Sequence, residues 1–87
     1  MNFQLGDRVL FVSYPSKEAQ RYCRHLRRSV PGNALIGRVG GIIEKVETCC
    51  AGFTWLVQMP NFDGSLVDQQ VAHLVVPART EDLARGA

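Results

Sequence analysis

Residues 37–46 read GRVGGIIEKV, and this run indicates the class of fold most directly. Its valine and isoleucine residues favour a β-strand, while Gly37, Gly40 and Gly41 interrupt it. Glycine inside a strand is typical of a bulge or bend at which two backbones approach closely. We therefore expect a strongly curved strand within residues 34–48. Its core candidates are Ile42, Ile43 and Val46.

Two further strands are predicted on either side of this run. Residues 5–14 read LGDRVLFVSY and place apolar side chains on both faces of a strand, which Pro15 ends. Residues 53–59 read FTWLVQM and alternate with a period of two, which is typical of a strand with one buried face. The face expected in the core carries Phe53, Trp55, Val57 and Met59.

The last third of the chain predicts two short strands. Residues 65–71 are polar and suit an edge strand, and residues 72–74 predict a single 3₁₀ turn after it. A short strand at residues 75–76 follows, and we expect Pro77 to end it because proline cannot donate to a ladder. Residues 80–87 predict a C-terminal tail that begins with one helical turn.

Residues 16–29 read SKEAQRYCRHLRRS and predict an amphipathic helix that begins at a Ser16 N-cap and stops before Pro31. At about 100° per residue the segment separates into two stripes. The apolar stripe comprises Ala19, Tyr22, Cys23 and Leu26. The basic stripe comprises Lys17, Arg21, Arg24 and Arg28. The basic stripe is either a contact face for an anionic partner or a solvated helix face.

Three segments together resemble the SH3-like small β-barrels: LGDRV at residues 5–9, GRVGGIIEKV at residues 37–46 and VAHLVVP at residues 71–77. The resemblance implies a mainly β fold, namely a five-stranded barrel with one helix inserted between the first two strands. It implies one domain over residues 1–79. In barrels of this kind the loop after the first strand is often functional, and the predicted basic helix fills that loop here.

Charge is distributed unevenly along the 87 residues, whose net charge is +2. Residues 1–45 carry eight basic and three acidic side chains, a balance of +5, whereas residues 46–87 carry two basic and five acidic ones, a balance of −3. This split suits an anionic partner or contact between copies of the chain. So short a chain has a thin core, which favours a homo-oligomer.

The remaining composition narrows the class of protein. No apolar run is long enough for a membrane span, and no secretory signal precedes the first strand, so we expect a cytoplasmic protein. The three cysteines are an odd number and do not predict a disulfide framework. Cys23, Cys49 and Cys50 lack the spacing of zinc ligands, so no metal or cofactor is expected, and Cys23 suits the core as a small hydrophobe.

The leading hypothesis is a small non-enzymatic binding module that contacts a protein partner, or another copy, through the basic helix and adjoining loops. We find no catalytic constellation in the sequence. Lys17, Arg21, Arg24 and Arg28 would supply charge. Phe62, in a predicted turn, and Trp55, if it lines a groove rather than the core, would supply apolar contact.

Three alternatives remain open: a nucleic-acid-binding protein, a self-associating structural protein, and an oligomeric small-molecule binder. The basic stripe could bind nucleic acid, although few aromatic side chains accompany it, or the charge split could drive a self-associating structural protein. The end of the chain, with Gly64, Ser65, Val71, Ala72 and Leu74, resembles the type II dihydrofolate reductases, which implies SH3-like barrels assembled as a tetramer around a pore. That family reads its substrate with a Val-Gln-Ile-Tyr strand, and residues 66–69 read LVDQ instead, so no catalytic residue is carried over.

Overall fold

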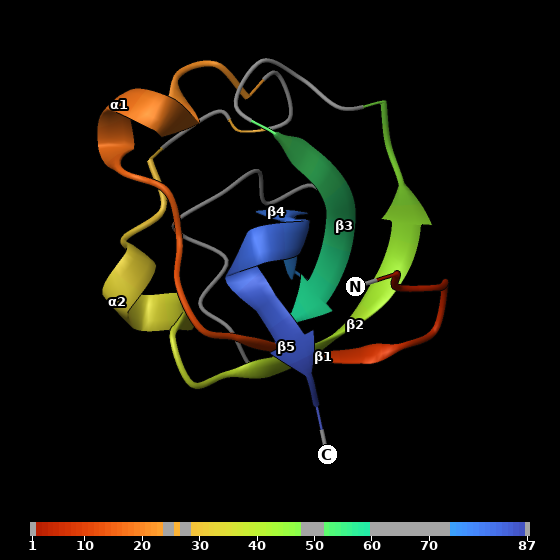
Figure 1. Ribbon diagram of the computed structural model, residues 1–87. Coiled ribbons are helices and arrows are strands. Elements are labelled where there is room, and N and C mark those ends of the chain that lie inside the picture. The colour runs from red at the N-terminus through yellow and green to blue at the C-terminus, as the bar shows by residue number, and fades with distance from the viewer. Residues whose placement is uncertain (1, 24–25, 27–28, 48–51, 60–73, 87) are drawn as a thin grey trace.

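A computed structural model describes residues 2–23, 26, 29–47, 52–59 and 74–86. It shows a five-stranded antiparallel sheet in the order β4-β3-β2-β1-β5, with two short helices on one flank (Figure 1). The predicted mainly β class is confirmed, although β5 is not one of the five strands that the sequence predicted. The strands are β1 (Arg8–Phe11), β2 (Val39–Lys45), β3 (Phe53–Met59), β4 (Leu74–Arg79) and β5 (Leu83–Arg85).

The expected irregularity in β2 is confirmed by a shift in its pairing with β3. Ile42 pairs with Val57, but Glu44 pairs with Leu56, so Ile43 is an extra residue. A bulge of this kind bends the strand and turns its side chains. Ile42 is accordingly buried, whereas Ile43 is 44% exposed. The expectation that Ile43 belongs to the core is therefore wrong, because successive residues of a strand face opposite sides and Ile42 takes the buried side.

The end of the chain belongs to the sheet, so the expectation of a tail from residue 80 is wrong. The 3₁₀ turn η2 (Thr80–Asp82) confirms the predicted helical turn, and it leads directly into β5. There Leu83 pairs with Phe11 of β1 and is buried. Local sequence could not reveal this strand, because its partner lies at the opposite end of the chain (Figure 1).

Strand β4 runs through Pro77 instead of ending before it. Among the described strands β4 pairs only with β3, so β4 lies at an edge of the sheet. At an edge, some backbone N–H positions point away from the neighbouring strand, and proline, which has no N–H, is tolerated there. The Pro77 carbonyl accepts a hydrogen bond from the Tyr14 hydroxyl at 2.8 Å, so this carbonyl points toward Tyr14 rather than toward β3. Leu74 already lies in β4 rather than in the 3₁₀ turn expected at residues 72–74. The strand expected at residues 65–71 lies outside the described residues.

The predicted helix over residues 16–29 is shortened to α1 (Lys17–Gln20). Ser16 caps it as expected, because its Oγ accepts a hydrogen bond from the Ala19 amide at 3.3 Å. After Gln20 the described residues form turns, in which the amides of Arg21, Tyr22, Cys23 and Leu26 each donate to the carbonyl three residues earlier. Leu26 and the buried Cys23 pack inward as expected, but Tyr22 is 68% exposed, so its place in an apolar stripe is wrong.

A second short helix, α2 (Gly32–Leu35), forms where a turn and the start of a strand were expected. Pro31 precedes it as the N-cap residue, and the Pro31 carbonyl accepts from the Ala34 amide at 3.0 Å. Leu35 is fully buried, and this burial stabilises the turn of helix. Gly37, with a φ of 86°, then redirects the chain into β2.

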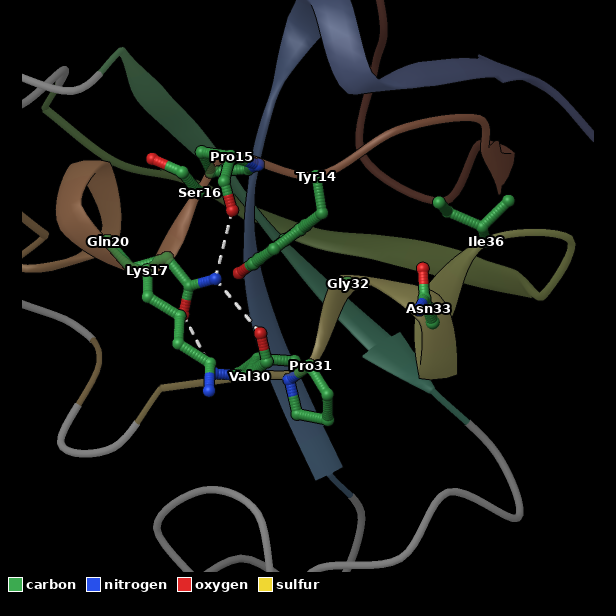
Figure 2. A pocket seen from close by; sticks show the side chains of 10 residues that line it. All are labelled: Tyr14, Pro15, Ser16, Lys17, Gln20, Val30, Pro31, Gly32, Asn33 and Ile36. Atoms are coloured by element: carbon green, nitrogen blue, oxygen red, sulfur yellow. Dashed lines mark hydrogen bonds between the residues drawn. The ribbon is translucent and has the colours of Figure 1, made fainter.

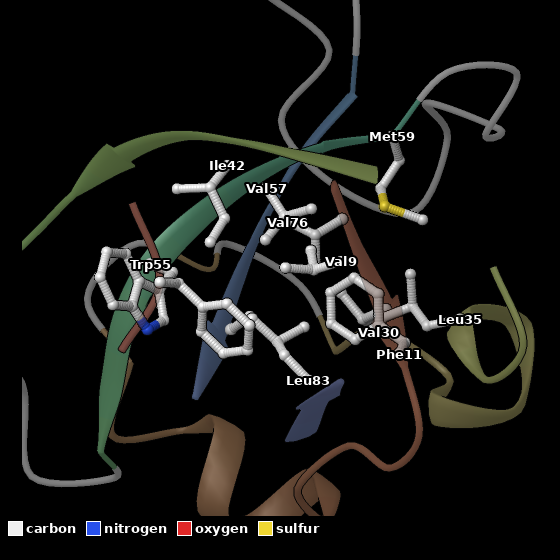
Figure 3. Close-up of a cluster of buried hydrophobic side chains, with 12 residues drawn as sticks. Val9, Phe11, Val30, Leu35, Ile42, Trp55, Val57, Met59, Val76 and Leu83 are labelled. Atoms are coloured by element: carbon white, nitrogen blue, oxygen red, sulfur yellow. The ribbon is translucent and has the colours of Figure 1, made fainter. Parts of the chain in front are cut away.

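The core lies between the curved strands and the segment that carries the two helices (Figure 3). In this view Trp55 lies at one end of the cluster and Leu35 at the other. The expected core face of β3 is confirmed, because Phe53, Trp55, Val57 and Met59 are all buried. The core cluster comprises Phe3, Val9, Phe11, Val30, Leu35, Ile42, Trp55, Val57, Met59, Val76, Ala78 and Leu83.

Candidate functional site

A surface pocket of about 450 Å³ lies between α1 and α2, in the segment that joins β1 to β2 (Figure 2). Its volume falls within the range typical of small-ligand and side-chain pockets. Four of its residues come from the approach to α1 and its first turn, and the rest from Gln20 and the chain around α2. The lining comprises Tyr14, Pro15, Ser16, Lys17, Gln20, Val30, Pro31, Gly32, Asn33 and Ile36.

Gln20 holds the two walls of the pocket together. Its side chain is 4% exposed, and its Nε2 donates to the carbonyl oxygens of Pro15, at 3.0 Å, and Val30, at 2.9 Å. Its Oε1 accepts from the Val30 amide at 2.7 Å. Figure 2 shows these three bonds: one joins Gln20 to Pro15 ahead of α1, and two join it to Val30 ahead of α2. Because this buried amide forms all three hydrogen bonds, it fixes the loop in one arrangement.

Tyr14 forms the inner wall of the pocket. Its ring lies against those of Phe11 and Phe53, with centroid separations of 5.9 and 6.1 Å. Its hydroxyl donates to the Pro77 carbonyl, which ties the pocket to β4. Burial raises the pKa of the Tyr14 phenol far above its ordinary value, and the nearby Cys23 and Asp82 add to the increase. Tyr14 is therefore a neutral, fixed wall rather than an acid or base.

The rim of the pocket is exposed and carries one positive charge. Lys17, Asn33 and Ile36 are exposed, and Ile36 retains 49% of its surface. Lys17 lies on the α1 side, whereas Asn33 and Ile36 lie on the α2 side (Figure 2). Lys17 forms no hydrogen bond or ion pair with any residue in the described part of the chain. Its ammonium is thus available to a group that enters the pocket.

The described residues that were predicted to contact a partner do not all lie at this pocket. Lys17 lines the pocket, and Arg21 is exposed at the C-cap of α1. Arg24, Arg28 and Phe62 lie outside the described residues. The structure therefore brings one of the four predicted cations to the pocket and leaves the second beside it.

Trp55 belongs to the core rather than to a groove. It is 6% exposed, and its ring meets that of Phe3 edge to face at 6.1 Å. Its Nε1 donates to the Thr80 Oγ1 at 2.8 Å, so the polar edge of the ring is already satisfied. Lys45 covers the ring at 5.5 Å. The indole in this arrangement offers little surface to a partner.

Sequence reasoning missed Gln20, Tyr14 and Ile36 as parts of a site. Gln20 stands in a polar segment in which a glutamine is ordinary, and its partner Val30 is ten residues away. Tyr14 was assigned to the end of a strand, and Ile36 to the start of the next one. A signal was present only in the proline at each end of the segment, Pro15 and Pro31, which both line the pocket.

A second polar cluster at η2 is structural. Asp82 is fully buried and accepts from the Arg79 guanidinium at 2.7 and 2.9 Å and from the Ser13 hydroxyl at 2.6 Å. The hydrogen bond to Asp82 raises the pKa of Arg79, so the guanidinium stays charged. Because each Asp82 oxygen has a partner, the cluster joins η2 to the end of β1 and presents no free reactive group.

Two other classes of site were sought in the described part of the chain. No three histidine, cysteine, aspartate or glutamate side chains there are grouped so that they could hold a metal ion. None of the helices within the described ranges has the length and apolar character needed to cross a membrane.

Comparison of the chain with protein-family models, with curated proteins and with solved structures finds no match.

Proposed function

We propose that this protein is a binding module built on an SH3-like barrel, and that it contacts a partner through the pocket between α1 and α2. Two observations support the barrel: the strand order β4-β3-β2-β1-β5, and the 3₁₀ turn η2 between β4 and β5. This is the arrangement expected of an SH3-like barrel, whose loop after the first strand is often functional. The pocket lies in that loop, between β1 and β2.

The observation that carries the proposal is the pocket itself. It has a rigid floor, because Gln20 and Tyr14 are held by four hydrogen bonds, and an exposed rim of Lys17, Asn33 and Ile36. A preformed pocket binds with a smaller loss of conformational entropy than a flexible loop. The combination therefore favours recognition of a partner at this place.

The chemistry of the lining supports binding rather than catalysis. General acid–base catalysis needs groups that exchange protons near the operating pH. Among its described lining residues the pocket offers one phenol whose pKa is raised by burial, one ammonium, the Ser16 hydroxyl that caps α1, and the amides of Gln20 and Asn33. These groups can hold and orient a ligand, which supports a binding role.

The test uses a random library of short peptides displayed on phage and panned against the immobilised protein. The affinities of enriched peptides are then measured for the wild type, Ile36→Ser and Ile43→Ser by fluorescence anisotropy. The two isoleucines are matched, since they are 49% and 44% exposed, but Ile36 lines the pocket and Ile43 lies on β2 outside it. We expect Ile36→Ser to weaken binding about tenfold and Ile43→Ser to leave it unchanged.

The proposal fails if no peptide is enriched over the bare support. It also fails if the enriched peptides bind Ile36→Ser as tightly as the wild type, because the pocket would then play no part. Circular dichroism of both variants checks that each retains the wild-type fold.

A further inference from the structure

We infer that the pocket between α1 and α2 takes an acidic peptide of a partner protein, with one apolar side chain inserted between Tyr14, Pro31 and Ile36 and a neighbouring carboxylate paired with Lys17. This inference rests on the proposed function and names the chemical class of the ligand. The observation that carries it is an apolar pocket with the Lys17 ammonium at its rim, which has no partner in the described part of the chain.

The inner surface suits an apolar side chain. Half of the ten lining residues are apolar or aromatic, namely Tyr14, Pro15, Val30, Pro31 and Ile36. The polar groups at the floor are already occupied: the Pro15 and Val30 carbonyls accept from Gln20, and the Tyr14 hydroxyl donates to Pro77. Since few polar atoms are left to pair, a polar group inserted deeply would lose its hydration without compensation.

The rim suits a negative charge beside that side chain. Lys17 reaches the pocket from α1 and has no partner among the described residues. The chain around it is basic as well, because residues 16–29 contain five basic side chains and one acidic one. A carboxylate on the ligand would be attracted by this charge and fixed by Lys17, which sets the register of the bound peptide.

A peptide fits better than a nucleic acid. Nucleic acid binding relies on several phosphate contacts and on exposed aromatic rings for base stacking. Among the described lining residues the pocket has one cation, Lys17, and its aromatic ring, Tyr14, is partly buried against Phe11 and Phe53. An apolar side chain needs only the apolar surface that the pocket provides.

The test compares two charge reversals that change the net charge of the protein equally. Lys17→Glu alters the rim, whereas Lys45→Glu alters the exposed end of β2 beside Trp55. Peptides enriched from the same random library are sequenced, and their affinities for the wild type and both variants are measured at low and high salt. A mixed-sequence single-stranded oligonucleotide is titrated in parallel, and sedimentation of each protein reports self-association.

We expect the enriched peptides to carry aspartate or glutamate next to an aromatic or aliphatic residue. Lys17→Glu should weaken their binding by about tenfold, and Lys45→Glu by less than about threefold. Replacing the acidic residue of a peptide with its amide should weaken binding to the wild type but not to Lys17→Glu, because only the wild type has the paired ammonium.

Four results would overturn the inference. Peptides that need Ile36 but lack acidic residues, or that bind Lys17→Glu normally, would refute the acidic ligand and leave the proposed function intact. Equal losses in both lysine variants would show that the charge acts from a distance. Tight oligonucleotide binding that needs Lys17, without peptide binding, would assign the site to nucleic acid. Self-association of the wild type that Lys17→Glu abolishes would assign it to a second copy of the chain.

Discussion

Gly40 shows how a single residue controls the approach of two strands. A β-carbon at this position would lie 2.5 Å from the Met59 Sδ, 2.6 Å from the Val57 Cγ1 and 2.7 Å from the Gln58 carbonyl oxygen. The sulfur could move, but the backbone oxygen of β3 could do so only by shifting the strand. Gly40 is therefore required by packing, as its position inside a predicted strand suggested.

Gly40→Ala should destabilise the protein by about 1–3 kcal/mol, because the added methyl group overpacks the core. Gly41→Ala is the matched control: a β-carbon at Gly41 meets nothing within 4 Å, so we expect a change within about 0.5 kcal/mol. Urea denaturation of both variants measures the free energies of unfolding. Equal losses in the two variants would contradict the packing argument.

Tyr14 should make stability decrease in alkaline solution. The folded state raises the pKa of its phenol above the ordinary value of 10.0, so this contribution is complete below pH about 10 and is lost as the pH rises further. Above that pH the unfolded chain releases the Tyr14 proton and the folded chain retains it. The free energy of unfolding should therefore fall by about 1.4 kcal/mol per pH unit on account of this group.

Tyr14→Phe removes the titrating group and should flatten the alkaline decrease by that amount. It should also cost about 1 kcal/mol at neutral pH, because the bond to the Pro77 carbonyl is lost. Denaturation curves at a series of pH values measure both effects. Wild-type and variant curves that run parallel above pH about 10 would show that Tyr14 does not titrate as described.

At the scale of the element, the segment between β1 and β2 depends on Gln20 rather than on helical periodicity. The sequence pattern predicts a helix over residues 16–29, yet α1 ends at Gln20. The buried Gln20 side chain bonds to Pro15 and Val30, which brings the two ends of the segment together. These tertiary hydrogen bonds compete with the continuation of a short helix, whose own stability is marginal.

Gln20→Ala should destabilise the protein by about 1–3 kcal/mol, because it leaves the Val30 amide and two buried carbonyls without their partner. Glu18→Ala, an exposed position on the same helix, serves as the control and should change stability by less than about 0.5 kcal/mol. Thermal and urea denaturation give the comparison. A Gln20→Ala protein as stable as Glu18→Ala would mean that the hydrogen bonds of Gln20 do not hold the loop.

At the scale of the whole molecule, the first and last strands pair with each other and join the two ends of the chain. β5 pairs with β1 in register from Val9 to Phe11, and the Val12 amide donates to the Asp82 carbonyl at 2.9 Å. Asp82 adds the buried pair with Arg79. Residues 80–86 are thus an integral part of the sheet and its core rather than an appendage to a domain of residues 1–79.

Removal of residues 80–87 should abolish cooperative folding, because it exposes Phe11 and leaves Arg79 and Ser13 without Asp82. Removal of residues 86–87 removes the backbone hydrogen bond from the Gly86 amide to the Arg8 carbonyl. We expect the shortened protein to fold. Circular dichroism during heating distinguishes the two. A cooperative thermal transition in the shorter chain would show that β5 is dispensable.

The amino-acid sequence by itself determined the mainly β class, the core face of β3, the Ser16 cap and the irregularity in β2. Each of these depends on residues close together in the chain: alternation, a capping hydroxyl, or glycine within a strand. Such local patterns can be recognised in the sequence without knowing which residues pack against them.

The tertiary structure alone decided the pocket, the end of α1, the passage of β4 through Pro77 and the pairing of β5 with β1. These features depend on hydrogen bonds between distant residues, such as Gln20 with Val30 and Tyr14 with Pro77. The physical reason is that a hydrogen-bond partner far along the chain leaves no periodic mark in the sequence. It becomes a neighbour only when the folded sheet brings the two segments together.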